Sequence, residues 1–455
     1  MNISLMPCHV LLSQIAQIIG AKPINLSDAE LARYVAGITT DTRSLKPGEI
    51  FVALRGDKFD GHEFVETALE KGAIAAITDH PLSGSLPHLC LEDTLKAYQT
   101  IAHWWRLQFD IPVIGITGSV GKTTTKELIA AVLSTKGDIL KTQANYNNEI
   151  GVPKTLLELS PMHNYAVIEM AMRARGEIAL LTQIAQPSVA VITNVGTAHI
   201  GRLGSEEAIA QAKCELLAEM PSNSIAVLNH DNRLLMETAA TVWQGQTITY
   251  GLEGGDLRGE LIDNETLCVE GVHLPLPLPG RHNASNFLAA LAVAKVLQVD
   301  WKSLTAGLSV NLPSGRAQRY DLPNDVAILD ETYNAGLESM LAALQLLAQT
   351  PGKRHIAVLG TMKELGERSP QFHFAVGEAA RRLNLDALLV LVDDKEAEAI
   401  ALGAAPLPAE CFSTHQAVVE RLKEMVQEGD RILFKASHSV ALSRVVNQLR
   451  TELTD

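Results

Sequence analysis

The sequence predicts a three-domain α/β protein, and three observations lead to this prediction. The chain has 455 residues, and domains of roughly 150 residues are usual, so about three are expected. Short β-branched runs recur, each followed by a polar or glycine-rich turn and then a helical pattern. Near-continuous apolar runs that alternate with helices indicate buried parallel strands. The runs lie at residues 112–117, 165–170, 189–195, 225–229, 326–330, 355–360, 387–392 and 431–437.

Two segments suggest where the domains meet. A long helical pattern over residues 91–110 leads into a Pro-containing turn and follows the first 90 or so residues. Around residue 313 a stretch rich in Pro, Gly and Asn interrupts the strand–helix pattern. We therefore expect domains at residues 1–90, 91–313 and 314–455. The apolar start of the chain has no Lys or Arg before its hydrophobic run, which favours an amphipathic first helix over a signal peptide.

Composition narrows the class of protein. The net charge of −14 argues against a nucleic-acid partner, because binding to a phosphate backbone needs a basic surface. The five cysteines are scattered and include no C-x-x-C pair, which predicts neither a zinc site nor a disulfide framework and fits a reducing compartment. No run of 18 apolar residues predicts a membrane span. We expect a cytoplasmic monomer.

The stretch GITGSVGKTTT, residues 115–125, predicts a phosphate-binding loop between a strand and a helix that begins near Thr123. Glycines let backbone N–H groups approach phosphates, a helix N-terminus favours anions, and Lys122 can neutralise terminal phosphates. Thr123 can coordinate Mg²⁺. The usual G-x-x-x-x-G-K-[ST] pattern fails, since Ile116 occupies the place of its first glycine. The residues expected to bind phosphate are Gly118, Ser119, Val120, Gly121, Lys122, Thr123 and Thr124.

Three further residues are candidates for a metal site, each with a simpler alternative. Glu169 ends a predicted strand and is either a Mg²⁺ ligand or a satisfied polar residue. His199 follows another strand end, where a lone histidine is more often structural. Lys213 falls on the apolar stripe of a helix predicted over residues 204–220, with Ser205 as its cap. Its side chain either snorkels to solvent or is desolvated, with a lowered pKa, and available for modification.

These elements together resemble the Mur ligases, which build the peptide stem of bacterial cell-wall precursors. That family has a T-G-x-x-G-K-[TS] loop, so Gly118 matches the family's own pattern. An acidic residue at a strand end follows, then N-x-x-x-A-H, then a lysine about 14 residues on; here these are Glu169, NVGTAH ending at His199, and Lys213. The resemblance implies that Lys213 is carbamylated, and that Thr123, Glu169, His199 and Lys213 together hold two Mg²⁺ ions.

Two segments resemble the substrate-binding parts of the family member that adds D-alanyl-D-alanine. Residues 37–64 resemble its N-terminal UDP-binding segment, and NYNNEIGVPKTLL, residues 145–157, resembles N-x-N-N-x-I-G-x-P-x-T-L-L near its substrate channel. On its residues alone, the segment at 37–64 would be a polar turn before a strand and only a weak signal. The resemblance implies substrate contacts at Asp41, Thr42, Arg43, Asn147 and Asn148.

The nucleotide-binding segments of that member are matched as well. Residues 279–294 resemble G-x-H-N-x-x-N-x-x-A-A, SGRAQRYD contains the arginine that reaches the γ-phosphate, and residues 328–340 resemble I-D-D-x-Y-N-A-N-P-x-S-M. The resemblance implies an adenine contact at Asn286, a ribose contact at Asp330, a γ-phosphate contact at Arg316, and nucleotide contacts at Tyr333 and Asn334.

Three departures from the family pattern lie in the last predicted domain. Gly336 and Leu337 replace an Asn-Pro pair, and Thr361 replaces an aspartate. Near the end, Lys435 is kept but His438 stands in place of an arginine. These departures bear on the finer nucleotide and dipeptide contacts rather than on the phosphate and metal site.

The resemblance implies a fold of three α/β domains. These are a small N-terminal UDP-binding domain, a central P-loop domain with a mostly parallel sheet that binds ATP, and a Rossmann-like C-terminal domain. The implied reaction joins D-Ala-D-Ala to UDP-N-acetylmuramoyl-tripeptide with ATP, through an acyl phosphate. Catalysis would fall to Lys122, His199, Lys213 and Arg316, with two Mg²⁺ ions. Because substrates arrive on separate domains, we expect the last domain to close onto the central one.

Two alternatives remain open. A related ligase could add an amino acid to a UDP-muramoyl peptide or glutamate to a folate, and would share the central domain. A P-loop ATPase that acts as a switch or motor would need no UDP-precursor site and would turn over ATP without an amine acceptor. The sequence does not predict whether the third residue of the tripeptide is lysine or diaminopimelate.

Overall fold

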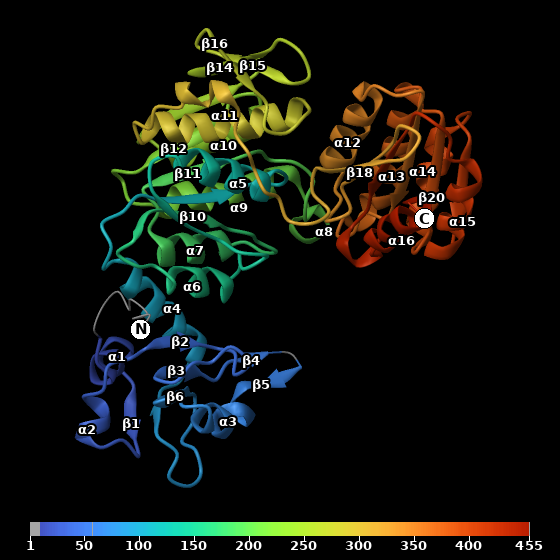
Figure 1. Ribbon diagram of the computed structural model, residues 1–455. Helices are drawn as coiled ribbons and strands as arrows, with labels where there is room; N and C mark the ends of the chain where they lie inside the picture. Colours follow the sequence, from blue (N-terminus) through green and yellow to red (C-terminus); the bar gives the residue numbers. More distant parts are fainter. Residues whose placement is uncertain (1–9, 57, 455) are drawn as a thin grey trace.

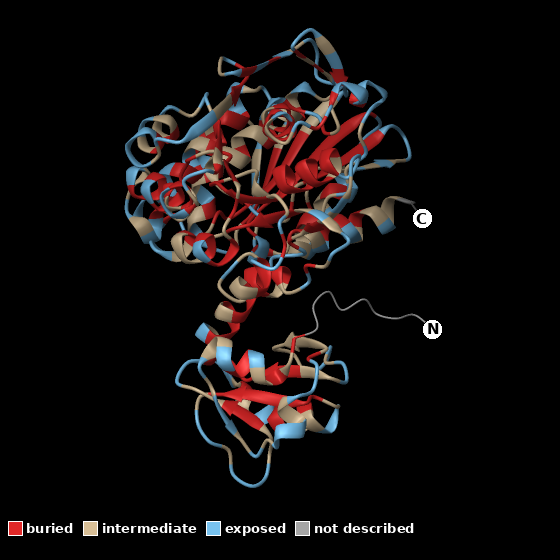
Figure 2. Ribbon diagram, turned by 90° about the vertical axis from the view of Figure 1, so that its left-hand side faces the viewer, coloured by how far each residue is buried: buried red, intermediate tan, exposed pale blue. Residues whose placement is uncertain are grey.

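The computed structural model describes residues 10–56 and 58–454 and is a mixed α/β structure with three large sheets. Figure 1 shows three groups of elements along the chain: an N-terminal group below, a central group above it, and a C-terminal group beside the central one. Buried residues concentrate on the sheet strands and on the helix faces that cover them (Figure 2). The predicted fold class is confirmed.

The N-terminal group is built on a five-stranded sheet of order β1-β7-β6-β3-β2, parallel except for β1. Helix α1 turns Leu12 and Ile15 into its core and ends at Gly20, whose φ of 64° suits glycine. The predicted first helix is confirmed from residue 12, while residues 1–9 lie outside the described part. The elements are α1 (Leu12–Ile19), β1 (Lys22–Ile24), α2 (Asp28–Leu31), β2 (Gly37–Thr39), β3 (Glu49–Val52), β4 (Arg55–Gly56), β5 (Phe59–Asp60), η1 (Gly61–Phe64), α3 (Val65–Glu70), β6 (Ala75–Thr78) and β7 (His88–Cys90).

Helix α4 (Thr94–Arg106) connects the N-terminal and central groups, as the pattern over residues 91–110 predicts (Figure 1). Its N-cap Asp93 accepts a hydrogen bond from the Lys96 amide at 2.8 Å. The helix packs against α1 on one side and against α6 and α7 on the other.

The central group is built on a nine-stranded sheet of order β16-β15-β14-β13-β12-β11-β8-β10-β9. The strands from β9 to β14 run parallel, and β15 and β16 add antiparallel pairs at one edge. Four predicted runs are confirmed as β8, β10, β11 and β12. The strands are β8 (Val113–Thr117), β9 (Asp138–Lys141), β10 (His163–Glu169), β11 (Val189–Ile192), β12 (Ile225–Asn229), β13 (Gln246–Gly251), β14 (Leu257–Leu261), β15 (Thr266–Val269) and β16 (Val272–Pro275).

Helices cover both faces of this sheet. α5 and α11 pack together on one face, and α7, α9 and α10 pack on the other. Because neighbouring strands run parallel, the ends of β8, β10 and β11 share one edge, where ligands of such sheets bind. The helices are α5 (Lys122–Leu133), α6 (Gly151–Leu156), α7 (Glu177–Ala185), α8 (Ile200–Leu203), α9 (Glu206–Glu219), α10 (Arg233–Val242), α11 (Arg281–Val296) and the 3-10 helix η2 (Lys302–Ala306).

The C-terminal group is built on a six-stranded sheet of order β17-β18-β22-β19-β20-β21, parallel except for β17. The other four predicted runs are confirmed as β18, β19, β20 and β22. The elements are β17 (Gln318–Leu322), β18 (Val326–Asp330), α12 (Leu337–Gln349), β19 (Arg354–Gly360), η3 (Gly366–Arg368), α13 (Ser369–Arg382), β20 (Ala387–Leu391), η4 (Lys395–Ala397), α14 (Glu398–Ala404), β21 (Ala409–Phe412), α15 (His415–Met425), β22 (Asp430–Lys435), η5 (His438–Val440) and α16 (Ser443–Thr454).

Two of the contacts between the C-terminal and central groups involve pairs of helices. α12 packs against α11, and η3 packs against α8, which Figure 1 shows beside the C-terminal group. Within the described residues, no helix combines the length and apolarity needed to cross a bilayer.

Candidate active site

The loop between β8 and α5 has two positions that only glycine can occupy. A Cβ on Gly118 would lie 1.9 Å from Thr193 Oγ1 at the end of β11. Gly121 has a φ of 82° and caps α5, and a Cβ there would lie 2.6 Å from Asn286 Oδ1 on α11. The glycines therefore let the loop lie directly against the neighbouring strand end and helix.

The loop is held by hydrogen bonds from the segment after β11. The Ser119 amide donates to Asn194 O at 3.0 Å, and the Val120 amide donates to Asn194 Oδ1 at 3.0 Å. The first amide of α5 with a partner inside the helix is that of Thr125, which donates to Gly121 O at 2.8 Å. The preceding amides at the start of this 12-residue helix are therefore directed toward an anion site.

Lys122 lies over its own loop. Its Nζ donates to Gly118 O at 2.7 Å and to Ser119 O at 3.3 Å. Burial lowers the pKa of Lys122; the nearby Glu169 carboxylate opposes that shift, and the Arg316 guanidinium adds to it. Two cations therefore share the space beside the loop, an arrangement that suits a highly charged anion such as a polyphosphate.

Glu169 ends β10 and is 2% exposed. Its Oε1 accepts a hydrogen bond from Asn147 Nδ2 at 2.8 Å, so the structure brings together one predicted metal ligand and one predicted substrate contact. Its Oε2 is buried and has no hydrogen-bond partner. Buried carboxylate oxygens are normally paired, so this atom fits the coordination of a cation such as Mg²⁺.

Buried polar atoms without a hydrogen-bond partner gather at this site. In the described part of the chain there are four such side-chain atoms, and three of them are Thr117 Oγ1, Glu169 Oε2 and Arg316 Nε. Thr117 ends β8 directly before the loop, and Arg316 lies close enough to lower the pKa of Lys122. Three unpartnered groups around one phosphate-binding loop indicate a site built to be completed by a ligand.

Lys126 is a buried cation at this site that sequence reasoning missed. It lies on α5 and is 1% exposed. Its Nζ donates to Thr142 O at 2.7 Å and lies 3.0 Å from Glu127 Oε1 and 3.8 Å from Glu169 Oε2. The sequence signal that could have identified it is the Lys126-Glu127 pair, which interrupts a run of mostly small and apolar residues in a helix that is buried on nearly every side.

Lys213 lies on α9, which Ser205 caps by accepting a hydrogen bond from the Ala208 amide at 3.2 Å. The lysine is 1% exposed, so the snorkelling interpretation is wrong for this side chain. Burial holds the pKa of Lys213 well below its usual range, and the nearby Lys122 lowers it further. A neutral amine is the form that reacts with carbon dioxide, so the site suits the predicted carbamylation.

His199 lies between β11 and α8 with a φ of 67°. Its Nδ1 lies 2.6 Å from Glu364 Oε2, a residue of the C-terminal group. Burial lowers the pKa of His199, with further contributions from Lys122 and Lys213, while Glu364 opposes the shift. The ring of His199 is thus held from the C-terminal group and lies within range of the charges of two buried lysines.

Arg316 is placed by aromatic stacking. Its guanidinium carbon lies 3.8 Å from the centre of the Tyr333 ring. The other neighbour of Tyr333 is His438, stacked with ring centres 5.6 Å apart and planes 18° apart. The histidine that replaces the family's arginine thus supports the ring on which Arg316 lies, and Lys435 Nζ donates to Asn334 O at 2.9 Å close by.

The other two departures also have structural partners. Thr361 donates a short hydrogen bond to Asp393 Oδ1, so a carboxylate from the end of β20 stands beside the position where the family has aspartate. Lys363 lies 3.1 Å from the other oxygen of Asp393. Gly336 is the N-cap of α12, with an ordinary φ of −148°.

Two residues that are predicted to contact the nucleotide already make hydrogen bonds within the protein. Asp330 is 2% exposed, and its Oδ1 accepts hydrogen bonds from the Thr332 amide at 3.0 Å and from Thr332 Oγ1 at 2.6 Å. Asn286 is 9% exposed, and its Oδ1 accepts from Thr125 Oγ1 at 3.2 Å. Asn334 is exposed. The structure brings Asn286 against the loop, whereas Asp330 faces its own turn.

A cavity of about 330 Å³ adjoins this edge of the sheet, between the ends of β12 and β13, the start of α11, and α12. Burial lowers the pKa of His282 to about 4, with a smaller contribution from Lys435, so its imidazole is neutral at pH 7. Sequence reasoning did not predict this cavity, although His282 lies in the segment matched for adenine binding. Its lining includes Asn229, Asp231, Gly280, His282, Ser285 and Gln345.

The predicted substrate contacts of the N-terminal group follow β2. Arg43 holds the Asp41 carboxylate with two nitrogens, at 2.9 and 2.7 Å, and lowers the pKa of Asp41 to about 2. Thr42 O accepts from Lys71 Nζ at 2.9 Å. Lys154 on α6 also lowers the Asp41 pKa, and Asn148 Oδ1 accepts a 2.9 Å hydrogen bond from the Gly151 amide at the start of the same helix.

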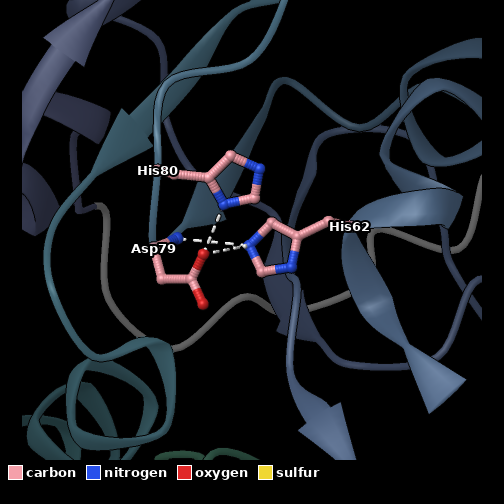
Figure 3. Close-up of side chains that lie close together, drawn as sticks. All are labelled: His62, Asp79 and His80. Atoms are coloured by element: carbon pink, nitrogen blue, oxygen red, sulfur yellow. Dashed lines mark hydrogen bonds and ion pairs between the residues drawn. The ribbon is translucent and has the colours of Figure 1, made fainter.

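A second group of possible metal ligands lies in the N-terminal group, where His62, Asp79 and His80 face one another with ligand atoms within 4.8 Å (Figure 3). Its atoms already have partners. The Arg55 guanidinium donates to both oxygens of Asp79, at 2.6 and 3.1 Å. His62 Nε2 accepts from the Asp79 amide at 3.2 Å, and its Nδ1 pairs with Asp60 at 2.6 Å. Because the Arg55 guanidinium already pairs with the carboxylate that a metal ion would bind, these three residues have a structural role.

Comparison with known proteins identifies the family. The model of the Mur ligase middle domain matches residues 116–294, that of the Mur ligase glutamate ligase domain matches residues 315–438, and that of the Mur ligase family catalytic domain matches residues 34–89. The chain is 61% identical to UDP-N-acetylmuramoyl-tripeptide–D-alanyl-D-alanine ligase of Synechocystis sp. over 92% of each chain. It is 37% identical to the Escherichia coli protein of the same name, over 97% of this chain and 98% of that one.

Solved structures agree with this. MurF from Acinetobacter baumannii matches with a TM-score of 0.88 and 30% identity, over 98% of this chain and 99% of that one. MurF ligase from Thermotoga maritima, in complex with ADP, matches with a TM-score of 0.84 and 32% identity, over 94% and 99% of the two chains. Identity at this level over nearly the whole length shows common descent, and the chain belongs to the Mur ligase family.

Proposed function

We propose that this enzyme joins D-Ala-D-Ala to UDP-N-acetylmuramoyl-tripeptide with ATP and so completes the pentapeptide precursor of peptidoglycan. The observation that carries the proposal is the set of buried atoms without a hydrogen-bond partner around the phosphate-binding loop, Thr117 Oγ1, Glu169 Oε2 and Arg316 Nε. It is supported by relatives that carry this activity in their names and cover nearly the whole chain.

Each charged group at the loop has a proposed role. Lys122 and Arg316 bind and neutralise the γ-phosphate, while the first amides of α5 hold the phosphate chain. Thr123, Glu169, His199 and carbamylated Lys213 hold Mg²⁺, with two ions in all. When bound, Mg²⁺ neutralises charge on the phosphates and on the reacting carboxylate. Glu169 Oε2, which is buried without a hydrogen bond, is the ligand atom that the structure supports best.

The proposed reaction proceeds in two steps. The terminal carboxylate of the tripeptide attacks the γ-phosphorus of ATP, which forms an acyl phosphate and releases ADP. The amine of D-Ala-D-Ala then attacks the acyl carbon, and the tetrahedral intermediate collapses to the new amide with loss of phosphate and a proton. The protein contributes chiefly by positioning the reactants and by fixed charges. Asp41, Thr42 and Arg43 are proposed to bind the UDP end, and Asn147 and Asn148 to line the path of the peptide.

The adenosine part of ATP is proposed to occupy the 330 Å³ cavity beside the loop. A neutral His282 can stack on a purine or hydrogen bond to it, and Asn286, which follows the cavity-lining Ser285, lies against Gly121. Asp330, Tyr333 and Asn334 are proposed to contact the ribose and phosphates from the C-terminal group. The Asp330 contact requires that its carboxylate share or leave its bonds to Thr332.

Other features of the enzyme remain predictions. We propose that it works in the cytoplasm, where ATP is available and where cysteines such as Cys90, Cys214, Cys268 and Cys411, free in the structure, stay reduced. The domain boundaries near residues 90 and 313 and the monomeric state also stay predictions.

The product identifies the acceptor and separates the proposal from its alternatives. The enzyme is incubated with ATP, Mg²⁺ and UDP-N-acetylmuramoyl-tripeptide, and with D-Ala-D-Ala, single amino acids, or glutamate and a folate. The proposal predicts that the mass of the UDP-pentapeptide appears only when D-Ala-D-Ala is the acceptor. The control variant Lys122→Met should form no product with any acceptor. Addition of a single amino acid or glutamylation of the folate would favour another ligase, and ATP turnover without an acceptor would favour an ATPase switch.

A further inference from the structure

Glu364 of the C-terminal group contacts His199 of the central group, and both residues have an unusual backbone conformation. His199 has a φ of 67° and Glu364 a φ of 66°, values that are uncommon for residues other than glycine. Such conformations are strained and cluster at functional sites. Here they direct two side chains toward each other, with Glu364 Oε2 2.6 Å from His199 Nδ1.

Several other contacts hold the loops of Glu364 and His199 together in this arrangement. Glu364 Oε1 accepts from Arg202 Nη2 at 3.0 Å, and Glu364 O accepts from the Gly201 amide at 3.1 Å. A Cβ on Gly201 would lie 2.6 Å from the Gly366 amide nitrogen, so the two loops are in close backbone contact. Nearby, Glu338 of α12 accepts from the Thr197 amide at 2.6 Å. Two carboxylates of the C-terminal group thus hold residues 196–202 of the central group.

The contact between Glu364 and His199 determines which nitrogen of the imidazole can bind a metal. An ionised carboxylate only accepts hydrogen bonds, so Nδ1 carries the proton that lies between it and Glu364. With Nδ1 directed at Glu364, Nε2 is the ring nitrogen left to bind a metal. A carboxylate behind a ligating histidine fixes the ring and raises the basicity of the other nitrogen. This support matters for Mg²⁺, which prefers oxygen ligands to imidazole.

We propose that Glu364 is a positioning residue that presents Nε2 of His199 to the metal site, and that it does so only while the C-terminal group is docked on the central group. The inference rests on the proposed function, in which His199 is a metal ligand. Its consequence is that docking completes the metal site. Without Glu364 the ring is free to rotate and to exchange tautomers, and the metal loses an oriented ligand.

The test measures metal binding directly. Mn²⁺ is titrated into the full-length enzyme in the presence of ADP and followed by electron paramagnetic resonance. Glu364→Ala is expected to weaken Mn²⁺ binding about tenfold or more, the usual loss for removal of such a partner. Glu364→Gln keeps an acceptor oxygen and is expected to restore most of the affinity. Arg202→Met and Glu338→Ala remove other contacts of the interface, leave Nδ1 of His199 paired, and are expected to stay within about twofold.

A second measurement separates orientation from mere docking. Nitrogen-15 NMR of labelled histidines, with His199→Ala to assign the signal, should show a single tautomer protonated at Nδ1 in the parent and a mixture in Glu364→Ala. Melting curves establish that each variant is folded. If His199→Ala weakens Mn²⁺ binding and Glu364→Ala does not, the inference is overturned while the proposed metal site stands. If His199→Ala binds Mn²⁺ like the parent, the ligand assignment fails, and the inference fails with it.

Discussion

Two buried lysines near the phosphate loop differ in their partners, and the difference bears on their chemistry. Lys126 contacts Glu127, Glu169 and a backbone carbonyl, so its ammonium charge is compensated. Lys213 is equally buried, but in the described part of the chain its Nζ has no hydrogen-bond or ion-pair partner, and its pKa is held well below the usual range. Of the two, Lys213 is therefore the amine available for carbamylation.

Replacement of Lys213 by Ala should remove a carboxylate-like ligand and lower turnover by roughly two orders of magnitude, a usual cost of losing a buried electrostatic stabiliser. If Lys213 carries the proposed carbamate, added acetate or formate should restore part of the activity, because these small carboxylates can enter the space left behind. Lys141→Ala, which removes a half-buried lysine that pairs with Glu127, is the control and should not respond to acetate. A Lys213→Ala enzyme with parental turnover would show that the modified lysine is dispensable.

The lowered pKa of His282 predicts that the folded enzyme loses stability in acid. Burial holds its pKa at about 4, below the ordinary value near 6.5, so between these values the unfolded chain binds a proton that the native state does not. Stability is unaffected above pH 6.5 and should fall as the pH drops toward 4. By pH 5 the loss should be about 1–2 kcal/mol. Melting temperatures of the parent and His282→Gln between pH 7.5 and 5 test this, and parallel curves would contradict it.

At the scale of elements, the sequence predicted eight strands of the central and C-terminal sheets, and it missed both strands without a continuous apolar run and the short buried strand β6 of the N-terminal sheet. All eight continuous apolar runs are strands in the structure. β17 was missed because its residues alternate between half-buried and exposed, pair on one side only, and lie in a segment rich in turn-forming residues. β14, β15 and β16 were missed because their residues also alternate between buried and more exposed positions, although only β16 lies at an edge of the central sheet. Strands with one face toward solvent carry alternating rather than continuous apolar residues.

The phosphate loop is the element on which ATP binding depends most. A Cβ at Gly118 would lie 1.9 Å from Thr193 Oγ1, so Gly118→Ala must push the loop from the end of β11. Overpacking of this kind costs about 1–3 kcal/mol, which is roughly 10- to 100-fold in ATP affinity if the loop bears the strain. Gly336→Ala is the control, because a Cβ there meets nothing within 4 Å at an ordinary φ. Calorimetric titration with ATP measures both, and equal affinities would contradict the assignment of the loop.

At the scale of the whole molecule, residues of the site come from both the central and the C-terminal group. The contacts between the two groups were not predicted from the sequence. Motif spacing placed Thr123, Glu169, His199 and Lys213 in the central group, since each follows a strand or lies on a helix with a recognisable pattern. It did not predict that Glu364 meets His199, because no local pattern reports how one sheet docks on another. Lys126 was missed for a related reason, since its partners come from three separate elements.

Docking of the C-terminal group should depend on the substrates. We expect ATP, Mg²⁺ and UDP-N-acetylmuramoyl-tripeptide to favour the docked arrangement, because each is held from more than one group. Small-angle scattering should show a smaller radius of gyration with these ligands. Gly201→Ala, whose Cβ would lie 2.6 Å from the Gly366 amide nitrogen, should resist this compaction. An unchanged radius of gyration in the parent enzyme would count against closure.

The most direct test of the central claim follows one oxygen atom through the reaction. UDP-N-acetylmuramoyl-tripeptide labelled with oxygen-18 in its terminal carboxylate is incubated with ATP, Mg²⁺ and D-Ala-D-Ala, and phosphate and peptide are analysed by mass spectrometry. If the carboxylate is activated as an acyl phosphate, each pentapeptide formed releases one phosphate that carries one oxygen from the tripeptide, and release requires both substrates. Unlabelled phosphate, or phosphate released without the tripeptide and the dipeptide, would show that the site hydrolyses ATP without activating the carboxylate.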